Sequence, residues 1–268
     1  MKQGRVAYAG AIHTAVPVDE SARPMHVRLA DGRGCMEHDV VWLPPFEAGT
    51  IVALGLNYAD HARELSFKSQ DEPLVFLKGA NSLLGHRGYT RRPSDATFMH
   101  YECELAVVVG RPARRVKRAD ARAHVAGYTV ANDYAIRDYL ENWYRPNLRV
   151  KSRDGGTVIG PWLVDADDVP WPPRLDLRTR VNGVVVQQGN TGDLVFDIPF
   201  LIEYLSAFMT LLPGDVILTG TPEGVVDVKA GDAVECEIDG IGRLLNTIAD
   251  DAAFGRGGSA RDACASST

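Results

Sequence analysis

Two carboxylates stand at the entrance of a strongly apolar run that extends from His100 to Gly110. Side chains in a β-strand alternate between its faces, so Glu102 and Glu104 are predicted to point the same way, roughly 6.5 Å apart. Two like charges at the edge of a core repel each other and resist desolvation unless a positive charge lies between them. The pair therefore indicates a hard divalent cation, and the alternative is a Glu-X-Glu pair on a solvated strand face.

A third carboxylate ends a second apolar, β-branched run, from Gly127 to Asp133. Three oxygen ligands from two strands would form half of an octahedral site and leave positions open for water or substrate. Asp133 therefore favours the metal interpretation over a solvated Glu-X-Glu pair.

An acid/base pair is predicted upstream of these strands, where His61 and Glu64 stand three residues apart in a loop that turns into a helix. Residues at i and i+3 lie on one helix face, and a histidine that exchanges its proton with a carboxylate is suited to acid/base catalysis. The alternative is a surface ion pair. Lys78, directly after an apolar strand, is either an anion contact in a cleft or a solvated strand end.

Two further segments favour binding of a small polyanion. Residues 135–156 combine four arginines, one lysine and three aromatic residues beside Asp133, and guanidinium groups bind carboxylates bidentately. The turn from Thr219 to Val225 is rich in small residues whose backbone N–H groups could cradle an anion. The candidate substrate contacts in these segments are Arg137, Tyr139, Arg145, Arg149, Lys151, Gly220 and Thr221. An exposed charged helix and an ordinary turn are the alternatives.

The composition is that of a globular protein, with 45% hydrophobic and 24% charged residues among 268. The net charge of −6 and the lack of a long basic block disfavour nucleic acid and anionic membranes as partners. The four cysteines lie far apart and predict reduced thiols. No apolar segment near the N-terminus suggests a signal peptide, so a cytoplasmic protein is expected.

The pattern of elements predicts a mainly β protein with short helices. Residues 1–48 are expected to form a small β element, residues 49–248 the catalytic domain and residues 249–268 a disordered tail. Asn182-Gly183 predicts a hairpin, and the apolar periodicity of residues 198–212 predicts a helix that faces the core. A short helix is expected at residues 119–126.

These segments together resemble the fumarylacetoacetate hydrolase family over about residues 50–248. The resemblance depends on separated motifs in the order found in the family: Asn57-Tyr58-X-X-His61-X-X-Glu64, Phe76-Leu77-Lys78, Tyr101-Glu102-X-Glu104-Leu105, Asn132-Asp133 with Arg137-Asp138, Lys151, Gly160-Pro161, and Thr219-Gly220-Thr221-Pro222-X-Gly224-Val225.

The resemblance implies the mixed β-sandwich roll of this family, with Mg²⁺ or Mn²⁺ on Glu102, Glu104 and Asp133. It implies that His61 and Glu64 form the acid/base dyad, and that Lys151 and Thr221 hold the 2-oxo acid end of the substrate. It also implies a homodimer, or a pairing with a sister subunit, that acts on a small di- or tricarboxylate.

Within the family, residues 132–154 and 187–191 are most similar to the isomerase/decarboxylase branch of homoprotocatechuate (4-hydroxyphenylacetate) catabolism. The implied substrates are 2-hydroxyhepta-2,4-diene-1,7-dioate and 5-oxopent-3-ene-1,2,5-tricarboxylate, which would react through a dienolate whose charge is met by the metal. Arg137, Arg145 and Arg149 are the hypothetical clamps for the distal carboxylate of such a substrate. Three alternatives stay open: hydrolysis of an acylpyruvate C–C bond, decarboxylation of oxaloacetate, and a noncatalytic metal-binding β module.

Overall fold

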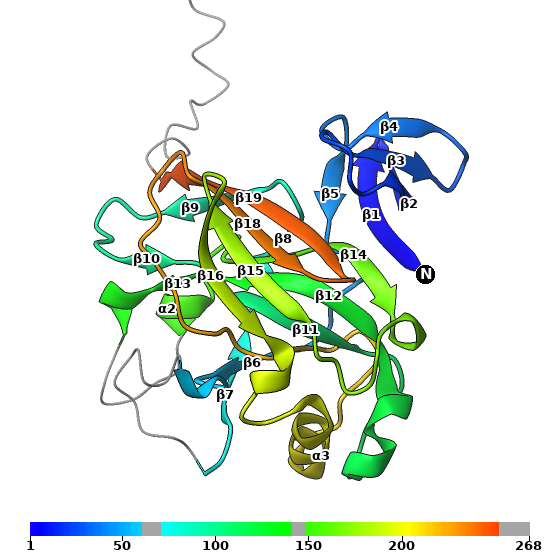
Figure 1. The fold of residues 1–268 in the computed structure, drawn as a ribbon, viewed down its shortest axis with the longest axis vertical. Helices are drawn as coiled ribbons and strands as arrows, with labels where there is room; N and C mark the ends of the chain where they lie inside the picture. Colours follow the sequence, from blue (N-terminus) through cyan, green and yellow to red (C-terminus); the bar gives the residue numbers. More distant parts are fainter. Residues whose placement is uncertain (61–70, 141–147, 252–268) are drawn as a thin grey trace, which may run out of the picture.

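The computed structural model describes residues 1–60, 71–140 and 148–251, and β-strands make up most of its regular structure (Figure 1). This confirms the predicted fold class, a mainly β protein with short helices. None of the helices among the described residues has the length and apolar character needed to cross a membrane.

The N-terminal residues form a small antiparallel element, as predicted. Its strands are β1 (Lys2–Tyr8), β2 (Ala11–Asp19), β3 (His26–Leu29), β4 (Gly34–Met36) and β5 (Val41–Leu43). Strand β1 also pairs with β14 of the main sheet, so the element extends that sheet at one end.

The main sheet has the strand order β4-β3-β2-β1-β14-β12-β11-β17-β6-β7. In addition, β5 pairs with β1 and β8 pairs with β14. Its further strands are β6 (Ile51–Gly55), β7 (Leu74–Lys78), β8 (Leu83–Leu84), β11 (Cys103–Val109), β12 (Val125–Asp133), β14 (Thr157–Asp165) and β17 (Val216–Leu218). All seven residues of β11 are buried, because it lies between β12 and β17 and is covered on both faces. Its valine-rich sequence fits this central position.

A second sheet packs over β11, β12 and β14 (Figure 1). It has the order β16-β15-β18-β19-β9, formed by β9 (Tyr89–Arg92), β15 (Asp176–Val181), β16 (Val184–Asn190), β18 (Ala233–Ile238) and β19 (Gly242–Asp250). The predicted hairpin joins β15 to β16, and Asn182 and Gly183 adopt φ angles of 50° and 82°, as a type I′ turn requires. Strand β19 reaches Asp250, so the predicted tail at residue 249 begins too early, while residues 252–268 lie outside the described residues.

The helices are short. Helix α3 (Ile198–Phe208) is capped at its N-terminus by Asp197, whose side chain accepts a hydrogen bond from the backbone N–H of Phe200 at 2.9 Å. The prediction of a helix to residue 212 was wrong at its end, because Leu211 leaves the helix and exchanges backbone hydrogen bonds with Ala113. Its side chain is buried there. The short helix expected at residues 119–126 is a 3₁₀ helix over Arg118–His124.

Alternation along β11 assigns its side chains to two cores. Cys103, Leu105 and Val107 belong to the main core between the sheets. Ala106 belongs to a smaller core on the opposite face of the main sheet, together with Ala131 of β12. The main sheet therefore has a second covered face, and Glu104 lies on it because it shares the parity of Ala106.

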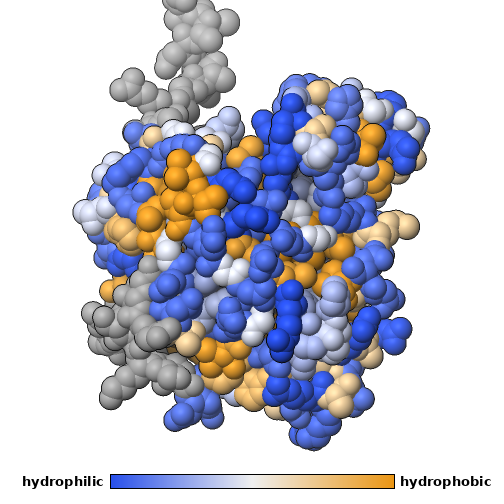
Figure 2. Space-filling model, in the orientation of Figure 1, coloured by the Kyte–Doolittle hydropathy of each residue, from blue (hydrophilic) through white to orange (hydrophobic). Residues whose placement is uncertain are grey.

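The surface in Figure 2 is mostly hydrophilic, with an apolar patch over the start of β16. Val184 and Val185 are 64% and 40% exposed there, on the edge strand of the second sheet. Cys35, Cys103 and Cys236 are free thiols, in agreement with the prediction from their spacing.

Candidate active site

Three carboxylates meet on the second face of the main sheet. Glu104 lies opposite Ala131 in the β11–β12 register, and the backbone N–H of Asp133 bonds to the carbonyl of Glu102 at 2.9 Å. Because side chains two residues apart share a face, Glu102, Glu104 and Asp133 point the same way. One carboxylate oxygen from each lies within 4.8 Å of the other two, and all three residues are buried. The predicted convergence of these carboxylates is therefore present.

Glu104 is the carboxylate with the fewest partners. Its Oε2 accepts the backbone N–H of Gly220 at 2.6 Å, but its Oε1 has no hydrogen-bond partner among the described residues. Burial, together with repulsion from Asp133 and Glu102, raises the pKa of Glu104 well above its usual value. A cation beside Oε1 would relieve this cost.

Two buried lysines contact the other carboxylates. Lys151, at the end of helix α2 (Leu148–Lys151), donates from Nζ to Glu102 Oε2 and, at 3.1 Å, to Asp133 Oδ2. Although burial favours the neutral amine, Asp133, Glu102 and Glu104 raise the pKa of Lys151. Lys78, at the end of β7, donates to Asp133 Oδ1 and to the carbonyl of Lys151. Burial lowers the pKa of Lys78, against the attraction of Asp133.

Arg137 adds a third positive charge at the edge of the cluster. Its terminal nitrogen Nη2 lies 3.7 Å from Glu102 Oε1, and its Nε donates to His100 Nε2 at 2.8 Å. His100 is fully buried, and this burial lowers its pKa to about 3. Arg137 therefore lies beside the carboxylates with its Nε already bonded to protein.

The turn after β17 closes another side of the site. Thr219 Oγ1 donates to the carbonyl of Leu105 at 2.9 Å, and Gly220 has a φ angle of +91°, which favours glycine. Thr221 Oγ1 accepts a hydrogen bond from Gln187 Nε2 at 3.0 Å. The predicted pair Gly220 and Thr221 is thus held against the cluster from β17, while Gln187 of β16 fixes the threonine hydroxyl.

Other predicted contacts lie apart from the carboxylates. The guanidinium of Arg149 stacks on the Tyr139 ring at 4.2 Å, and the Tyr139 hydroxyl donates to Asp95. Among the described residues, no hydrogen bond or ion pair joins Tyr139 or Arg149 to the cluster. His61, Glu64 and Arg145 lie outside the described residues. Their predicted roles stay predictions.

The donor set fits a divalent cation. Three buried carboxylates supply oxygen ligands only, which Mg²⁺ and Mn²⁺ prefer. The orphaned Oε1 of Glu104 marks a polar atom that the protein leaves for another partner. The described residues therefore support a divalent metal at Glu102, Glu104 and Asp133, without distinguishing Mg²⁺ from Mn²⁺.

Three residues of the site were not assigned roles from the sequence. They are Asn57, His100 and Gln187. The Asn57 side chain bonds to both backbone groups of Phe196 and to the carbonyl of Thr219. His100 could have been found from its place beside Glu102, whereas the contact of Gln187 with the turn depends on packing between sheets.

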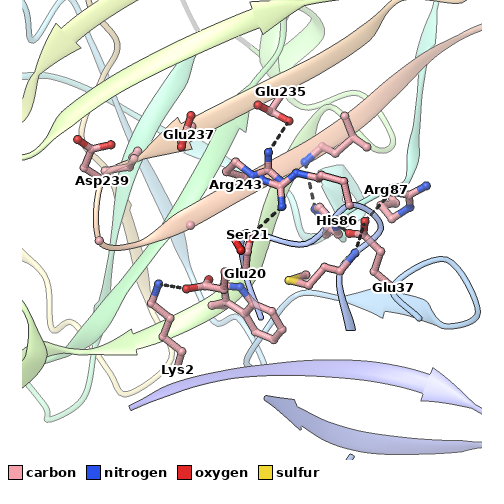
Figure 3. Close-up of a pocket in the computed structure, with 17 residues that line it drawn as sticks. Lys2, Glu20, Ser21, Glu37, His86, Arg87, Glu235, Glu237, Asp239 and Arg243 are labelled. Carbon is pink, nitrogen blue, oxygen red and sulfur yellow. Dashed lines mark hydrogen bonds and ion pairs between the residues drawn. The ribbon is translucent and has the colours of Figure 1, made fainter. Parts of the chain in front are cut away.

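A separate cavity of about 420 Å³ lies between the N-terminal element and strands β18 and β19 (Figure 3). Charged pairs line it, including Lys2 with Glu20 at 2.6 Å and Arg243 with Glu235 at 3.5 Å. His86 bonds to Glu37 there, at 3.3 Å. These charges compensate one another within the protein, and none of the predicted site residues lines this cavity.

Comparison with known proteins agrees with the geometry. Residues 50–249 match the fumarylacetoacetate (FAA) hydrolase C-terminal family. The chain belongs to the fumarylacetoacetate hydrolase family. A relative within this family, a 4-hydroxyphenylacetate degradation bifunctional isomerase/decarboxylase from Salmonella dublin, is 61% identical over 232 residues. The match covers 82% of this chain and 54% of the relative, so the chain spans about half the length of such relatives.

Two solved structures of the family are also similar. The 2-hydroxyhepta-2,4-diene-1,7-dioate isomerase from Mycobacterium marinum has 36% identity and a TM-score of 0.79, with 94% of this chain and 99% of that chain covered. The fumarylpyruvate hydrolase from Pseudomonas aeruginosa, in complex with Mn²⁺ and pyruvate, has 32% identity and a TM-score of 0.73, with 78% and 92% covered.

Proposed function

We propose that the protein is a divalent-metal-dependent isomerase/decarboxylase of homoprotocatechuate catabolism. Its substrates would be 2-hydroxyhepta-2,4-diene-1,7-dioate, 5-oxopent-3-ene-1,2,5-tricarboxylate or both. The observation that carries this proposal is the buried cluster of Glu102, Glu104 and Asp133, with Lys151 and Arg137 beside it. The 61% identity with the bifunctional Salmonella dublin protein supports the choice of reaction.

The metal, when bound, would supply a Lewis acid that stabilises negative charge on the oxygens of a 2-oxo acid. The protein residues would bind and orient the rest of the substrate. Lys151 and Thr221 would hold the 2-oxo carboxylate end, and Arg137 would pair with a substrate carboxylate through its terminal nitrogens. Gly220 supplies an N–H to Glu104 Oε2, so the turn and the carboxylate are directly linked.

Proton transfer is assigned to His61 and Glu64, which lie outside the described residues. His61, paired with Glu64, would take a proton from one carbon of the conjugated chain and return it to another, which is isomerisation. Loss of CO₂ from the tricarboxylate would give the same dienolate, so one site can serve both reactions. His61→Ala is therefore expected to abolish isomerisation.

A second candidate is hydrolysis of an acylpyruvate C–C bond. The likeness to the fumarylpyruvate hydrolase with Mn²⁺ and pyruvate favours it, since that protein shares the fold over 92% of its length. In this alternative, His61 and Glu64 would activate water rather than move a substrate proton. The products distinguish the two reactions, because hydrolysis yields two smaller acids, whereas isomerisation yields a single acid of the same mass as the substrate.

The test is an assay of the purified protein with the tricarboxylate, the dioate and an acylpyruvate, each with Mg²⁺, Mn²⁺ or EDTA. Chromatography separates isomers of equal mass, and mass spectrometry detects cleavage and loss of CO₂. Conversion of the dioate or tricarboxylate that needs both a metal and His61 is the expected result. Cleavage of the acylpyruvate without conversion of the other two substrates would favour the hydrolase alternative. No metal-dependent turnover of any substrate would refute both enzymatic proposals.

Light scattering after size exclusion tests the predicted homodimer.

A further inference from the structure

His100 is a fully buried histidine that lies two residues before Glu102 and contacts Arg137. Strand β10 (Met99–His100) pairs with β13 (Ala135–Ile136), with His100 opposite Ala135. The backbone N–H of Arg137 bonds to the carbonyl of Phe98 at 3.0 Å, which continues this ribbon by one residue. The ribbon therefore fixes the backbone positions of His100 and Arg137 relative to each other.

The hydrogen bonds of His100 define one tautomer. A guanidinium N–H can only donate, so His100 Nε2 must accept from Arg137 Nε, at 2.8 Å. A carbonyl can only accept, so His100 Nδ1 must carry the hydrogen that is shared with the carbonyl of Tyr101, at 3.0 Å. Both ring nitrogens are therefore used, one as donor to the chain and one as acceptor for Arg137.

This arrangement restricts the Arg137 side chain. A guanidinium has five N–H donors in a planar fork, and fixing Nε at one edge sets the direction of its two terminal nitrogens. One of these nitrogens lies 3.7 Å from Glu102 Oε1, and the side chain keeps 23% of its surface exposed. The terminal nitrogens thus lie at the edge of the carboxylate cluster, where a ligand could meet them.

A neighbouring contact supports the same orientation. The Asp138 carboxylate accepts the backbone N–H groups of Thr97 at 2.8 Å and of Phe98 at 3.0 Å. The residue after Arg137 is therefore tied to the residues before His100. With both chain segments fixed, the imidazole is the group that decides where the guanidinium plane points.

We propose that His100 is a positioning residue, which holds Arg137 by its Nε so that the terminal nitrogens face a carboxylate of the substrate. This inference rests on the proposed function, because it places Arg137 in contact with a dianionic 2-oxo acid. His100 itself does not touch the substrate. It acts by removing the rotational freedom that Arg137 would otherwise lose on binding.

The kinetic test uses two replacements of the histidine and a matched control. His100→Phe keeps a ring of similar size but removes the acceptor, and we expect KM for the dioate to rise at least tenfold while kcat changes less than twofold. His100→Gln offers an amide oxygen as acceptor and should restore KM to within about threefold of the wild type. His86→Phe, at a buried histidine bonded to Glu37 and Leu245, should leave KM unchanged.

A double-mutant cycle separates positioning from a general loss of structure. In an Arg137→Leu background, His100→Phe should change KM by less than twofold, since there is no guanidinium left to position. An equal rise of KM in both backgrounds, or a KM for His100→Phe that matches the wild type, would overturn the proposal.

An NMR measurement tests the contact without any activity. The ¹⁵Nε–¹H signal of Arg137, identified by its loss in Arg137→Leu, should be protected from solvent exchange in the wild type and in His100→Gln. It should lose this protection in His100→Phe. A signal that His100→Phe leaves unaltered would reject the positioning role. Absence of turnover by the wild type would instead reject the proposed function, so the two failures are distinguishable.

Discussion

Glu104→Gln is the substitution that most directly tests the electrostatics of the site. Glu104 is buried, with one oxygen bonded to Gly220 and the other without a partner among the described residues. The amide oxygen of glutamine can still accept from Gly220, and its NH₂ group can donate toward the neighbouring carboxylates. We therefore expect the variant to be more stable than the wild type when no metal is bound, and unable to gain stability from a metal.

The size of the effect follows from the raised pKa of Glu104. The folded state keeps a proton on this carboxyl at a pH where the unfolded chain has lost it, so the wild type loses stability as pH rises. This loss begins near 4.5, the ordinary pKa of a glutamate in the unfolded chain, and continues to the raised pKa of the folded protein. Over this range, the free energy of unfolding falls by up to about 1.4 kcal/mol per pH unit. For a chain of this size, this corresponds to a fall in Tm of about 3–6 °C per pH unit.

The assay is thermal unfolding of the wild type and Glu104→Gln from pH 5 to 8, in EDTA and in excess Mn²⁺. In EDTA, the Tm of the variant should rise above that of the wild type as pH increases. Metal at about 100 times its Kd should add about 2.7 kcal/mol to the wild type and almost nothing to the variant. Glu47→Gln, at an exposed carboxylate, is the control. Parallel Tm curves in EDTA, or equal gains from Mn²⁺, would refute the reasoning.

Three further perturbations test other parts of the site. Lys151→Met removes the nearest counter-charge of Glu102 and one of the two lysines that contact Asp133. It should cost about 3–5 kcal/mol of unfolding free energy in EDTA, with part of this loss recovered in Mn²⁺; urea unfolding with no such recovery would contradict it. Asn57→Ala removes three hydrogen bonds to backbone groups of Phe196 and Thr219 and should lower Tm by about 6–12 °C in calorimetry, whereas a shift below about 2 °C would show that these groups find other partners. Arg149→Ala should raise KM for the dioate far less than Arg137→Ala, because Arg149 stacks on an aromatic ring away from the carboxylates, and equal effects would restore it as a clamp.

The carboxylates could be found from the sequence because strand periodicity is strict. Glu102 lies just before strand β11 and Glu104 is its second residue. Because side chains two residues apart in a strand share a face, the two carboxylates point the same way irrespective of which strands pair with β11. Asp133 follows from the same rule once β12 pairs with β11 in the observed register. The carboxylate cluster is therefore a local property of two adjacent strands.

The remaining contacts depend on pairings that no local pattern encodes. Gln187 reaches Thr221 from another sheet, and Lys78 reaches Asp133 from β7, four strands from β12 in the sheet order. The end of helix α3 was misplaced for a similar reason, since Leu211 is buried by a bridge to Ala113 rather than by helical packing. The boundary at residue 48 stays a prediction.

The central position of β11 has a consequence for how such a protein can diversify during evolution. Its residues are buried on both faces, so changes near Glu104 disturb the packing of two cores and would cost stability. Positions such as Arg149 and Glu223 are exposed and can vary at little cost to stability. New substrate preferences would therefore arise by changes at exposed positions while the carboxylates stay the same. This agrees with the different reactions named for relatives that share this fold.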